Sequence, residues 1–334
     1  MRITPLGRGK PAALAAVLAA ACLAVAACGD DDDGGGGGGG SSGGGDKKLT
    51  LLAGVKGDEF YITMNCGAQA EAKKLGVSVD FQGPDQFDPS LQTPIVNAIA
   101  AKKPDALLVA PTDSKAMYSP IKQVADAGSK VVLVDTTLDQ ADFAVSQIAS
   151  DNEGGGRAAA KALADQIGGK GKVFVVNVKP GISTTDLRAK GFEEEAKKLG
   201  LTYVGVDYSN DQPDKAAAIV KAQLAKNPDL KGIFATNLFS AEGSASGLRE
   251  AGKQDTVKIV SFDAGPAQVK ALNDGTVQGL IAQQPYLIGQ YGIDQAVAAL
   301  DGGTVAPKIQ TGSTTITKDN VNGDGADAIY KSSC

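Results

Sequence analysis

The feature that most constrains the fold of this chain is a regular alternation of short apolar runs with longer helix-like stretches, which begins near Lys48. Runs such as "DALLVAP" and "KVVLVDTT" are rich in apolar and β-branched residues, as buried strands are. The stretches between them have helical length, and several end at a glycine, which is a common helix stop: Gly76, Gly128, Gly200 and Gly252. Strands that alternate with such helices form parallel sheets covered by helices on both faces. The expected fold class is therefore α/β with doubly wound parallel sheets.

The alternation occurs twice, and the two halves share short sequences in the same order. "EAKKLG" stands at 71–76 and again at 195–200, an offset of 124 residues. Pro104 and Pro228 are also 124 residues apart, in "KKPDALLVA" and "KNPDLKGIFA". An internal repeat of this length predicts two lobes of the same architecture.

The N-terminal residues have the pattern of a bacterial lipoprotein signal peptide. Arg2, Arg8 and Lys10 supply positive charge, and "AALAAVLAAACLAVAA" is an apolar segment too short and too rich in alanine for a good membrane span. It ends in "VAAC", with small residues directly before Cys28, which resembles a bacterial lipobox. We therefore expect residues 1–27 to be a signal peptide and Cys28 to carry lipid. Ordinary secretion with cleavage at an alanine is the alternative.

A low-complexity segment, "GDDDDGGGGGGGSSGGGD" at 29–46, follows the cysteine. It contains nothing to bury, so it predicts a flexible tether with a reach of roughly 20–25 Å. The segment 28–46 is thus expected to join a lipid anchor to a folded part that starts near Lys47. The expected location is outside the cytoplasm, anchored by lipid to the membrane, in the periplasm or on the outer face of the cytoplasmic membrane.

Composition and missing motifs exclude several kinds of site. The chain has no histidine, which excludes a Ser-His-Asp triad, a Cys-His pair and a His-ligated metal. The formal net charge of −5 disfavours nucleic-acid binding. "EGGGRAAA" lacks the Gly-Lys-Ser/Thr end of a phosphate loop, and "NVNGDGADAIYK" has Lys331 where a calcium loop needs glutamate. We expect no cofactor and no metal.

Two apolar runs end on a carboxylate, which is costly to bury unless it has a partner. Asp135 follows "KVVLV" and Asp263 follows "VKIVSF", 128 residues later. Ligands of open parallel sheets bind beyond the carboxyl ends of the strands, so two facing lobes would bring both carboxylates into one cleft. There they would accept hydrogen bonds from hydroxyl or N–H groups of a polar ligand. The alternative is that each aspartate caps the helix that follows it.

Seven stretches of the chain have the order and spacing of a known family: "FYITMNCGAQAEAKKLG", "VAPTDSKA", "VVLVDTT", "IASDNEGGGRAAAKAL", "IFATN", "VSFDAGP" and "LNDGTVQGLIAQQPYLIGQYG". From Leu49 to about Thr317 the chain resembles a type I periplasmic binding protein, most closely the ribose-binding group that serves sugar ABC transporters. The resemblance implies two similar doubly wound lobes joined by a three-strand hinge, with the ligand in the cleft between them.

We expect the chain to cross between the lobes near 149–151, near Gln283 and near Gln310. Three connections restrict the relative motion of the lobes to a hinge bend around the cleft. The expected bounds are 48–149 plus 284–309 for the N-terminal lobe, 150–283 plus 310–317 for the C-terminal lobe, and 318–334 for a C-terminal tail.

The resemblance also implies which residues contact the ligand. The loop "KGDEFY" places Asp58, Phe60 and Tyr61 at the cleft, where aromatic rings stack on sugar faces in relatives. A core contact at the start of a helix is the alternative for these rings. The other matched positions are Asp135, Asn237, Asp263 and, where the chain crosses back between the lobes, Gln283.

Several positions depart from the ribose-binding pattern. Thr136 stands where the family has an arginine after the first-lobe aspartate, and Ala110 stands where it has an asparagine. Asp186 replaces a second arginine, although Arg188 keeps the family's next one. Asp211 is nearest to the position of a second-lobe phenylalanine, and we count it, Asp186 and Arg188 among the expected ligand contacts. The cleft thus loses two arginines and gains acids, which leaves a polyol, a sugar other than ribose and an amino-bearing ligand open.

The expected function is the capture of a small polar ligand, a sugar or polyol, by a monomeric lipoprotein that delivers it to the permease of an ABC importer without catalysis. A ligand sensor for a membrane receptor has the same fold and is an alternative. A glycosidase that uses Asp135 and Asp263 as its carboxylate pair is a weaker alternative, because no other catalytic residue stands out. A lac-repressor-like regulator is disfavoured by the signal peptide and the missing helix-turn-helix segment.

Two cysteines remain for a disulfide if Cys22 is removed with the signal peptide and Cys28 carries lipid. Cys66 lies on the first expected helix, and Cys334 ends a polar tail long enough to fold back. Pairing is favoured outside the cytoplasm, so a Cys66–Cys334 bond is expected. A buried thiol and a frayed terminus are the alternative.

Overall fold

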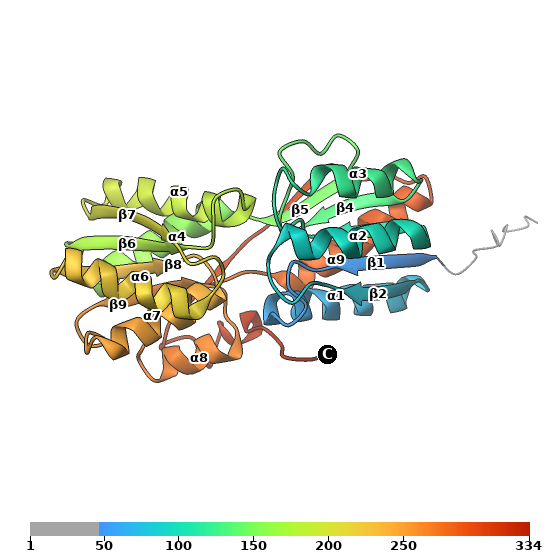
Figure 1. Ribbon diagram of the computed structural model, residues 1–334. Coiled ribbons are helices and arrows are strands. Elements are labelled where there is room, and N and C mark those ends of the chain that lie inside the picture. Colours follow the sequence, from blue (N-terminus) through green and yellow to red (C-terminus); the bar gives the residue numbers. More distant parts are fainter. Residues whose placement is uncertain (1–46) are drawn as a thin grey trace, which may run out of the picture. The chain divides into compact units, whose positions relative to one another are not determined.

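The computed structural model describes residues 47–334, which contain two six-stranded sheets with helices on both faces (Figure 1). The expected signal peptide, the lipidation site Cys28 and the tether up to residue 46 lie outside the described residues. No helix within 47–334 is both long and apolar enough to cross a membrane.

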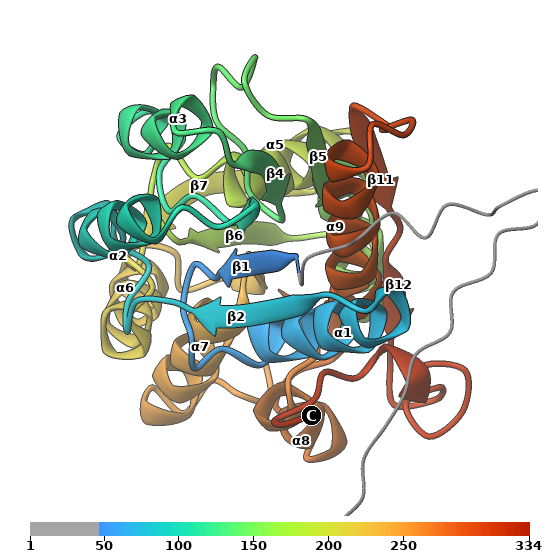
Figure 2. The same cartoon turned by 90° about the vertical axis from the view of Figure 1, so that its right-hand side faces the viewer.

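The first sheet has six parallel strands: β1 (Lys48–Leu52), β2 (Ser78–Gln82), β3 (Ala106–Val109), β4 (Lys130–Val134), β5 (Ser146–Ser150) and β11 (Lys308–Thr311), in the order β2-β1-β3-β4-β5-β11. Its helices are α1 (Glu59–Leu75), α2 (Pro89–Lys102), α3 (Tyr118–Asp126) and α9 (Pro285–Leu300). Side chains of a strand alternate between the faces. Leu51 of β1 therefore packs with α1 and α9, whereas Leu52 packs with α2 and α3, on opposite sides of the sheet (Figure 2). This sheet and its helices are called the N-terminal lobe.

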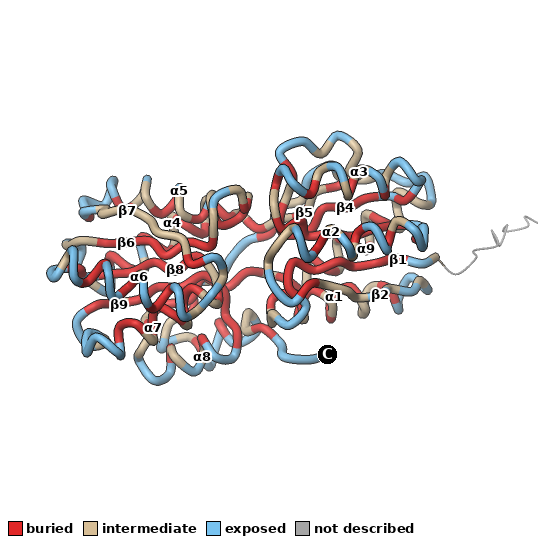
Figure 3. Tube along the Cα trace, in the orientation of Figure 1, coloured by how far each residue is buried: buried red, intermediate tan, exposed pale blue. Residues whose placement is uncertain are grey.

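The second sheet repeats this plan: β6 (Lys172–Asn177), β7 (Thr202–Tyr208), β8 (Leu230–Ala235), β9 (Lys258–Phe262), β10 (Gly279–Ala282) and β12 (Thr314–Ile316), in the order β7-β6-β8-β9-β10-β12. Its pairs are parallel except for β12, which is antiparallel to β10. Its helices are α4 (Asn152–Gln166), α5 (Ser183–Lys198), α6 (Pro213–Lys226), α7 (Leu238–Glu250) and α8 (Pro266–Asn273). The inner strands of both sheets are buried over most of their length (Figure 3). The expected doubly wound α/β fold with two similar lobes is confirmed, and we call this half the C-terminal lobe.

Three segments connect the lobes, between β5 and α4, between β10 and α9, and between β11 and β12. They are bonded to one another, because the Ser150 hydroxyl donates to Gln283 Oε1 at 2.7 Å and lies 3.4 Å from the Thr311 hydroxyl. The third crossing follows Thr311, one residue after Gln310, because β11 stays paired with β5 up to Thr311. We propose these crossings as the lobe boundaries.

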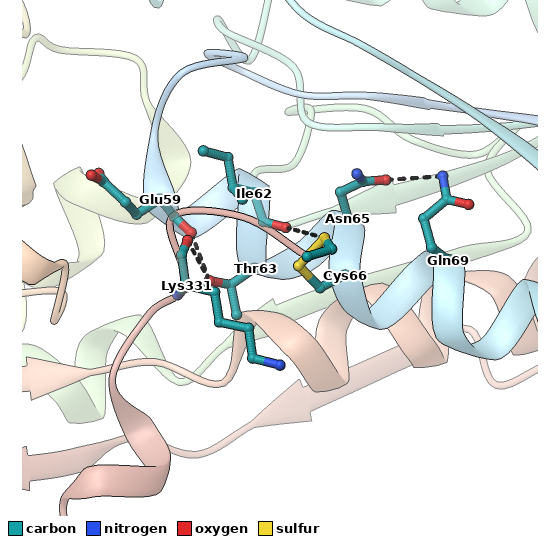
Figure 4. The surroundings of a disulfide bond; sticks show 8 residues. Glu59, Ile62, Thr63, Asn65, Cys66, Gln69 and Lys331 are labelled. Carbon is teal, nitrogen blue, oxygen red and sulfur yellow. Dashed lines mark hydrogen bonds between the residues drawn. A yellow bond between two sulfur atoms is a disulfide. The ribbon is translucent and has the colours of Figure 1, made fainter.

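Cys66 of α1 and Cys334 form the disulfide expected from the sequence, with Cα atoms 5.3 Å apart. The tail after β12 ends with a short 3₁₀ turn, Ala326–Ala328, and a segment that runs back to α1. Figure 4 shows Lys331 of this segment beside Thr63 of α1, one turn from Cys66. The tail of the C-terminal lobe is therefore fastened covalently to the N-terminal lobe.

Candidate ligand-binding site

A polar cavity lies between the lobes and is lined by residues of both. The following expected ligand contacts line it: Asp58, Phe60, Tyr61, Asp135, Arg188, Asp211, Asn237, Asp263 and Gln283. Residues that the sequence did not indicate also line it, namely Phe87, Val178, Ile182, Thr184 and Thr185.

Asp135 and Asp263 directly follow β4 and β9, at the carboxyl ends of the two sheets. Their backbone φ angles are 63° and 75°, in the left-handed region that residues other than glycine rarely adopt. Neither aspartate caps a following helix, because β5 comes next after Asp135 and Gly265 is the N-cap of α8. Unusual backbone conformations cluster at functional sites, and here the same one occurs at corresponding positions in both lobes.

The two carboxylates differ in how fully other residues already satisfy them. Asp263 accepts hydrogen bonds from Gln283 Nε2 at 2.7 Å, from Tyr330 Oη at 3.1 Å and from the Leu238 backbone N–H at 3.2 Å. Asp135 accepts one bond from a side chain within the described residues, from Tyr61 Oη at 2.7 Å. A carboxylate has about four acceptor positions, so Asp135 retains the greater capacity for ligand donors.

Two further acids line the cavity, Asp58 at the N-terminus of α1 and Asp211 in the loop before α6. Asp58 is the N-cap of α1 and accepts a bond from the Phe60 N–H at 2.8 Å. Asn237 is the N-cap of α7, and its amide Nδ2 donates to Asp211 Oδ1 at 2.6 Å. The caps thus hold the Asp58 and Asn237 side chains in place.

Enclosure in the cavity changes the acidity of these groups. Removal from water raises the pKa of Asp135 to about 6, although Arg188 and the Tyr61 hydrogen bond act in the opposite direction. Removal from water, with a further contribution from Asp263, also raises the pKa of Asp211 to about 6. The same effects raise the pKa of Asp58 well above its usual value. A ligand that donates hydrogen bonds would favour the ionised forms.

Arg188 is the one cationic side chain among the described residues that line the cavity. It is buried, and its guanidinium donates to Asn152 Oδ1 at 2.8 Å and to the Thr236 carbonyl at 2.9 Å. The guanidinium carbon lies 3.8 Å from the centre of the Phe262 ring, a cation–π arrangement. Its fixed position supplies positive charge beside Asp135.

Helix α5, which carries Arg188, approaches α4 very closely. A side chain added at Gly156 of α4 would place its Cβ 2.1 Å from the Arg188 carbonyl oxygen, and one added at Gly191 would lie 2.1 Å from that of Glu153. These glycines allow the two helix backbones to come into contact. The close contact positions the first turn of α5 relative to the cleft.

Asp186 does not line the cavity, in contrast to the expectation from the sequence. Its carboxylate accepts bonds from the Gly181 backbone N–H at 2.9 Å and from Asn177 Nδ2 at 3.3 Å. It therefore stabilises the loop before α5 instead of facing a ligand. Thr184 and Thr185 in the same turn take its place in the cavity lining.

Thr185 has a buried hydroxyl that makes no hydrogen bond to any other residue within 47–334. Buried hydroxyl groups are usually paired, because an unpaired one loses its bonds to water without compensation. A ligand in the cavity could provide the missing partner. The one sequence signal for Thr185 was its position in the first turn of a helix that follows a strand.

Direct contacts also bridge the lobes around the cavity. The Ser114 N–H donates to the Gly181 carbonyl at 3.1 Å, and the Thr137 N–H donates to the Ser183 hydroxyl at 2.9 Å. Lys179 Nζ donates to the Phe87 carbonyl at 3.2 Å. The structure therefore holds the two lobes in contact, with the carboxylates enclosed between them.

Two similar lobes, a hinge of three crossings and an enclosed polar cavity define a two-lobed ligand-binding protein. Residues 50–304 match the family model described as a periplasmic binding protein domain, and the chain belongs to that family.

The chain is similar to the ribose import binding protein RbsB of Escherichia coli K12, with 30% identity over 260 residues, 78% of this chain and 87% of that protein. The D-ribose/D-allose-binding protein of Pseudomonas aeruginosa is 31% identical over 268 residues, 77% of this chain and 83% of that protein.

Among solved structures, an ABC transporter solute-binding protein of Agrobacterium vitis bound with α-D-tagatopyranose is 45% identical, with a TM-score of 0.83 over 85% of this chain and 99% of that chain. Another from Agrobacterium vitis, with bound D-fucose, is 29% identical, with a TM-score of 0.80 over 85% of this chain and 100% of that chain.

Proposed function

We propose that the protein captures a monosaccharide in the interlobe cavity and delivers it, as a monomer and without catalysis, to the permease of an ABC importer. This proposal rests on one observation. Asp135 and Asp263, both with a left-handed backbone conformation, present carboxylates from opposite lobes to one cavity. Sugar hydroxyls are suitable donors for them, and the aromatic residues Phe60 and Phe87 also line the cavity, where sugar C–H groups can pack against apolar rings. The sugars named for the relatives support this ligand class.

A thermal-shift screen tests the proposal, because a ligand that binds only the folded state raises the melting temperature. The panel contains D-tagatose, D-ribose, D-allose, D-fucose, a polyol and an amino sugar. A neutral monosaccharide at a concentration of 100 times its Kd is expected to raise Tm by about 4–6 °C. If only the amino sugar raises Tm, the ligand is cationic and not neutral. If no sugar raises Tm, the proposal is contradicted.

We also propose a location outside the cytoplasm, with a lipid anchor at Cys28. The membership of the chain in the periplasmic binding protein family supports the location, and the "VAAC" sequence supports the anchor. Separate anchor and cavity suit a protein that must reach a membrane permease while its lobes open and close.

The acidity of Asp135 and Asp211 predicts a dependence of sugar affinity on pH. Both carboxyls have a pKa of about 6, so acidification from pH 7.5 to 5 protonates them and removes acceptors for sugar hydroxyls. If binding requires one such group to be ionised, Kd rises about tenfold when the pH falls from 7.5 to 5. Calorimetric titration at several pH values measures the change, and proton release on binding near pH 6 should accompany it.

Acidification, which weakens sugar binding through these two groups, has the opposite effect on the stability of the ligand-free protein. Their pKa values are higher in the folded state than in the unfolded chain, so the folded state binds more protons between about pH 4 and 6. Their contribution to the free energy of unfolding is present at low pH and is lost as the pH rises through this window.

For the affinity itself, a Kd that stays constant or decreases on acidification would contradict the assignment of these carboxylates to ligand hydroxyls.

The unpaired hydroxyl of Thr185 predicts a second, local effect. Thr185→Val keeps the shape of the side chain and removes one hydrogen bond to the sugar, so Kd is expected to rise about three- to tenfold. The stability of the ligand-free protein should stay the same or increase, because no internal bond is broken. Thr136→Val is the matched control, since its hydroxyl donates to the Pro111 carbonyl at 2.7 Å and lies outside the cavity lining. It should lower stability and leave Kd within about twofold, and the reverse pattern for the pair would rule out a ligand contact at Thr185.

A further inference from the structure

The C-terminal tail contacts both lobes next to the cavity. Tyr330 is buried, and its backbone N–H donates to the carbonyl of Ala264 in the C-terminal lobe at 3.0 Å. The next residue, Lys331, donates its backbone N–H to the Thr63 hydroxyl on α1 of the N-terminal lobe at 2.7 Å. The disulfide to Cys66 then secures the tail to the same helix (Figure 4). The tail is thus a fourth link between the lobes.

The Tyr330 hydroxyl forms hydrogen bonds with two residues that line the cavity, Asp263 and Gln283, although Tyr330 is not part of the lining. It accepts a bond from the Gln283 backbone N–H at 2.9 Å and donates to Asp263 Oδ1 at 3.1 Å. The same oxygen of Asp263 also accepts from Gln283 Nε2 at 2.7 Å. The Tyr330 ring packs edge-on against Phe60, with centroids 5.9 Å apart. Tyr330 itself does not line the cavity, so it acts on a ligand through these neighbours.

The chemistry of this contact suits a fixed support for a carboxylate. Burial, with Asp263 nearby, raises the pKa of Tyr330 well above its usual value, which keeps the hydroxyl a donor. Gln283 belongs to the second crossing and is bonded to Ser150 of the first. Tyr330 therefore joins the strand-end aspartate, the hinge and, through Phe60, the first helix of the other lobe.

We propose that Tyr330 is a positioning residue of the ligand site, and that the Cys66–Cys334 disulfide increases sugar affinity by holding Tyr330 against Asp263 and Gln283. This inference rests on the proposed sugar-binding function. Three residues, 331–333, separate Tyr330 from Cys334, so the disulfide limits how far the tyrosine can move from its place. Without the disulfide, a detached tail leaves Asp263 without one donor and the Gln283 N–H without its acceptor. Reduction of the bond then loosens the grip on the sugar.

A mutant cycle with D-tagatose and D-ribose as probes tests this inference. The variants are Tyr330→Phe, the pair Cys66→Ala with Cys334→Ala, and all three changes together. Tyr330→Phe keeps the ring and removes the hydroxyl, so Kd is expected to rise about three- to tenfold, with a similar or smaller rise for the cysteine pair. Because the disulfide acts through the tyrosine, the triple variant should bind within about twofold of Tyr330→Phe. Tyr118→Phe is the control, because this ring packs on Phe143 of the N-terminal lobe, outside the cavity lining, and its Kd should match the parent.

A second readout needs no ligand and separates this inference from the proposed function. Amide hydrogen exchange at Gln283 should become faster in Tyr330→Phe and in the cysteine pair, because both disturb the acceptor of its N–H. If the parent binds neither sugar, the proposed ligand fails, while the exchange rates still decide whether the disulfide and Tyr330 support Gln283. Unchanged affinity in Tyr330→Phe, fully additive losses in the triple variant, or unchanged exchange at Gln283 would each overturn the inference.

Discussion

Replacement of Asp263 or Asp135 by alanine is expected to weaken sugar binding by about 10- to 150-fold in each case. A hydrogen bond to a charged group is worth about 1.5–3 kcal/mol, and each variant removes at least one such bond to the ligand. Asp263→Ala also leaves the donors on Gln283 and Tyr330 without their acceptor in a buried region. Titration calorimetry of the parent and of both variants, with the sugar that emerges from the thermal-shift screen, measures the losses.

The double variant and the asparagine variants extend this prediction. Each lobe needs the other for closure, so the two alanine changes together should show an interaction energy rather than simple addition. Asparagine at either position should be milder than alanine for a neutral sugar and nearly as damaging for a cationic ligand. Asp207→Ala is the control, since this carboxylate pairs with Gln223 and does not line the cavity. If both alanine variants bind within about twofold of the parent, the aspartates are structural.

Arg188→Met is expected to lower the free energy of unfolding by about 3–5 kcal/mol. The change removes two buried bonds from a charged group, to Asn152 and to the Thr236 carbonyl, and the contact with the Phe262 ring. Sugar binding at neutral pH should weaken as well, because Arg188 holds down the pKa of Asp135. Arg188→Lys should recover little, since an ammonium group cannot reproduce the planar set of donors.

Chemical denaturation measures this loss, with Arg157→Met as the matched control. Arg157 is a partly exposed residue of α4 that pairs with Glu153 four residues earlier, and its replacement should cost less than about 1 kcal/mol. Equal stability losses in the two variants would show that the buried position of Arg188 has no special role. A shift of the denaturation midpoint without a change in slope would identify a true change in stability.

The general plan of the fold could be predicted from the sequence because strand and helix periodicities differ and the pattern occurs twice. The location of Asp135 and Asp263 followed from the same reasoning, since the carboxyl ends of parallel strands lie at one edge of a sheet. The third crossing was expected near Gln310, and its last residue is set by the pairing of β11 with β5, which local sequence does not reveal.

The direction of individual side chains in the cleft could not be predicted. Asp186 and Thr185 are neighbours on the first turn of α5, where successive residues point about 100° apart. Which of them faces the cavity depends on how far α5 is set against α4, and so on glycines such as Gly156. Tyr330 lay beyond any periodic pattern, 67 residues after Asp263, and its place depends on the Cys66–Cys334 bond.

The most direct measurement is a crystal structure of the protein with the monosaccharide that gives the largest thermal shift. The sugar is predicted to lie in the interlobe cavity, with hydroxyl groups within about 2.5–3.0 Å of carboxylate oxygens of both Asp135 and Asp263. Thr185 should also contact it, and the lobes should keep the Ser114–Gly181 hydrogen bond across the cleft. A sugar bound elsewhere, or held by one lobe without a contact to the other aspartate, would contradict the two-lobe grip on which the proposed function depends.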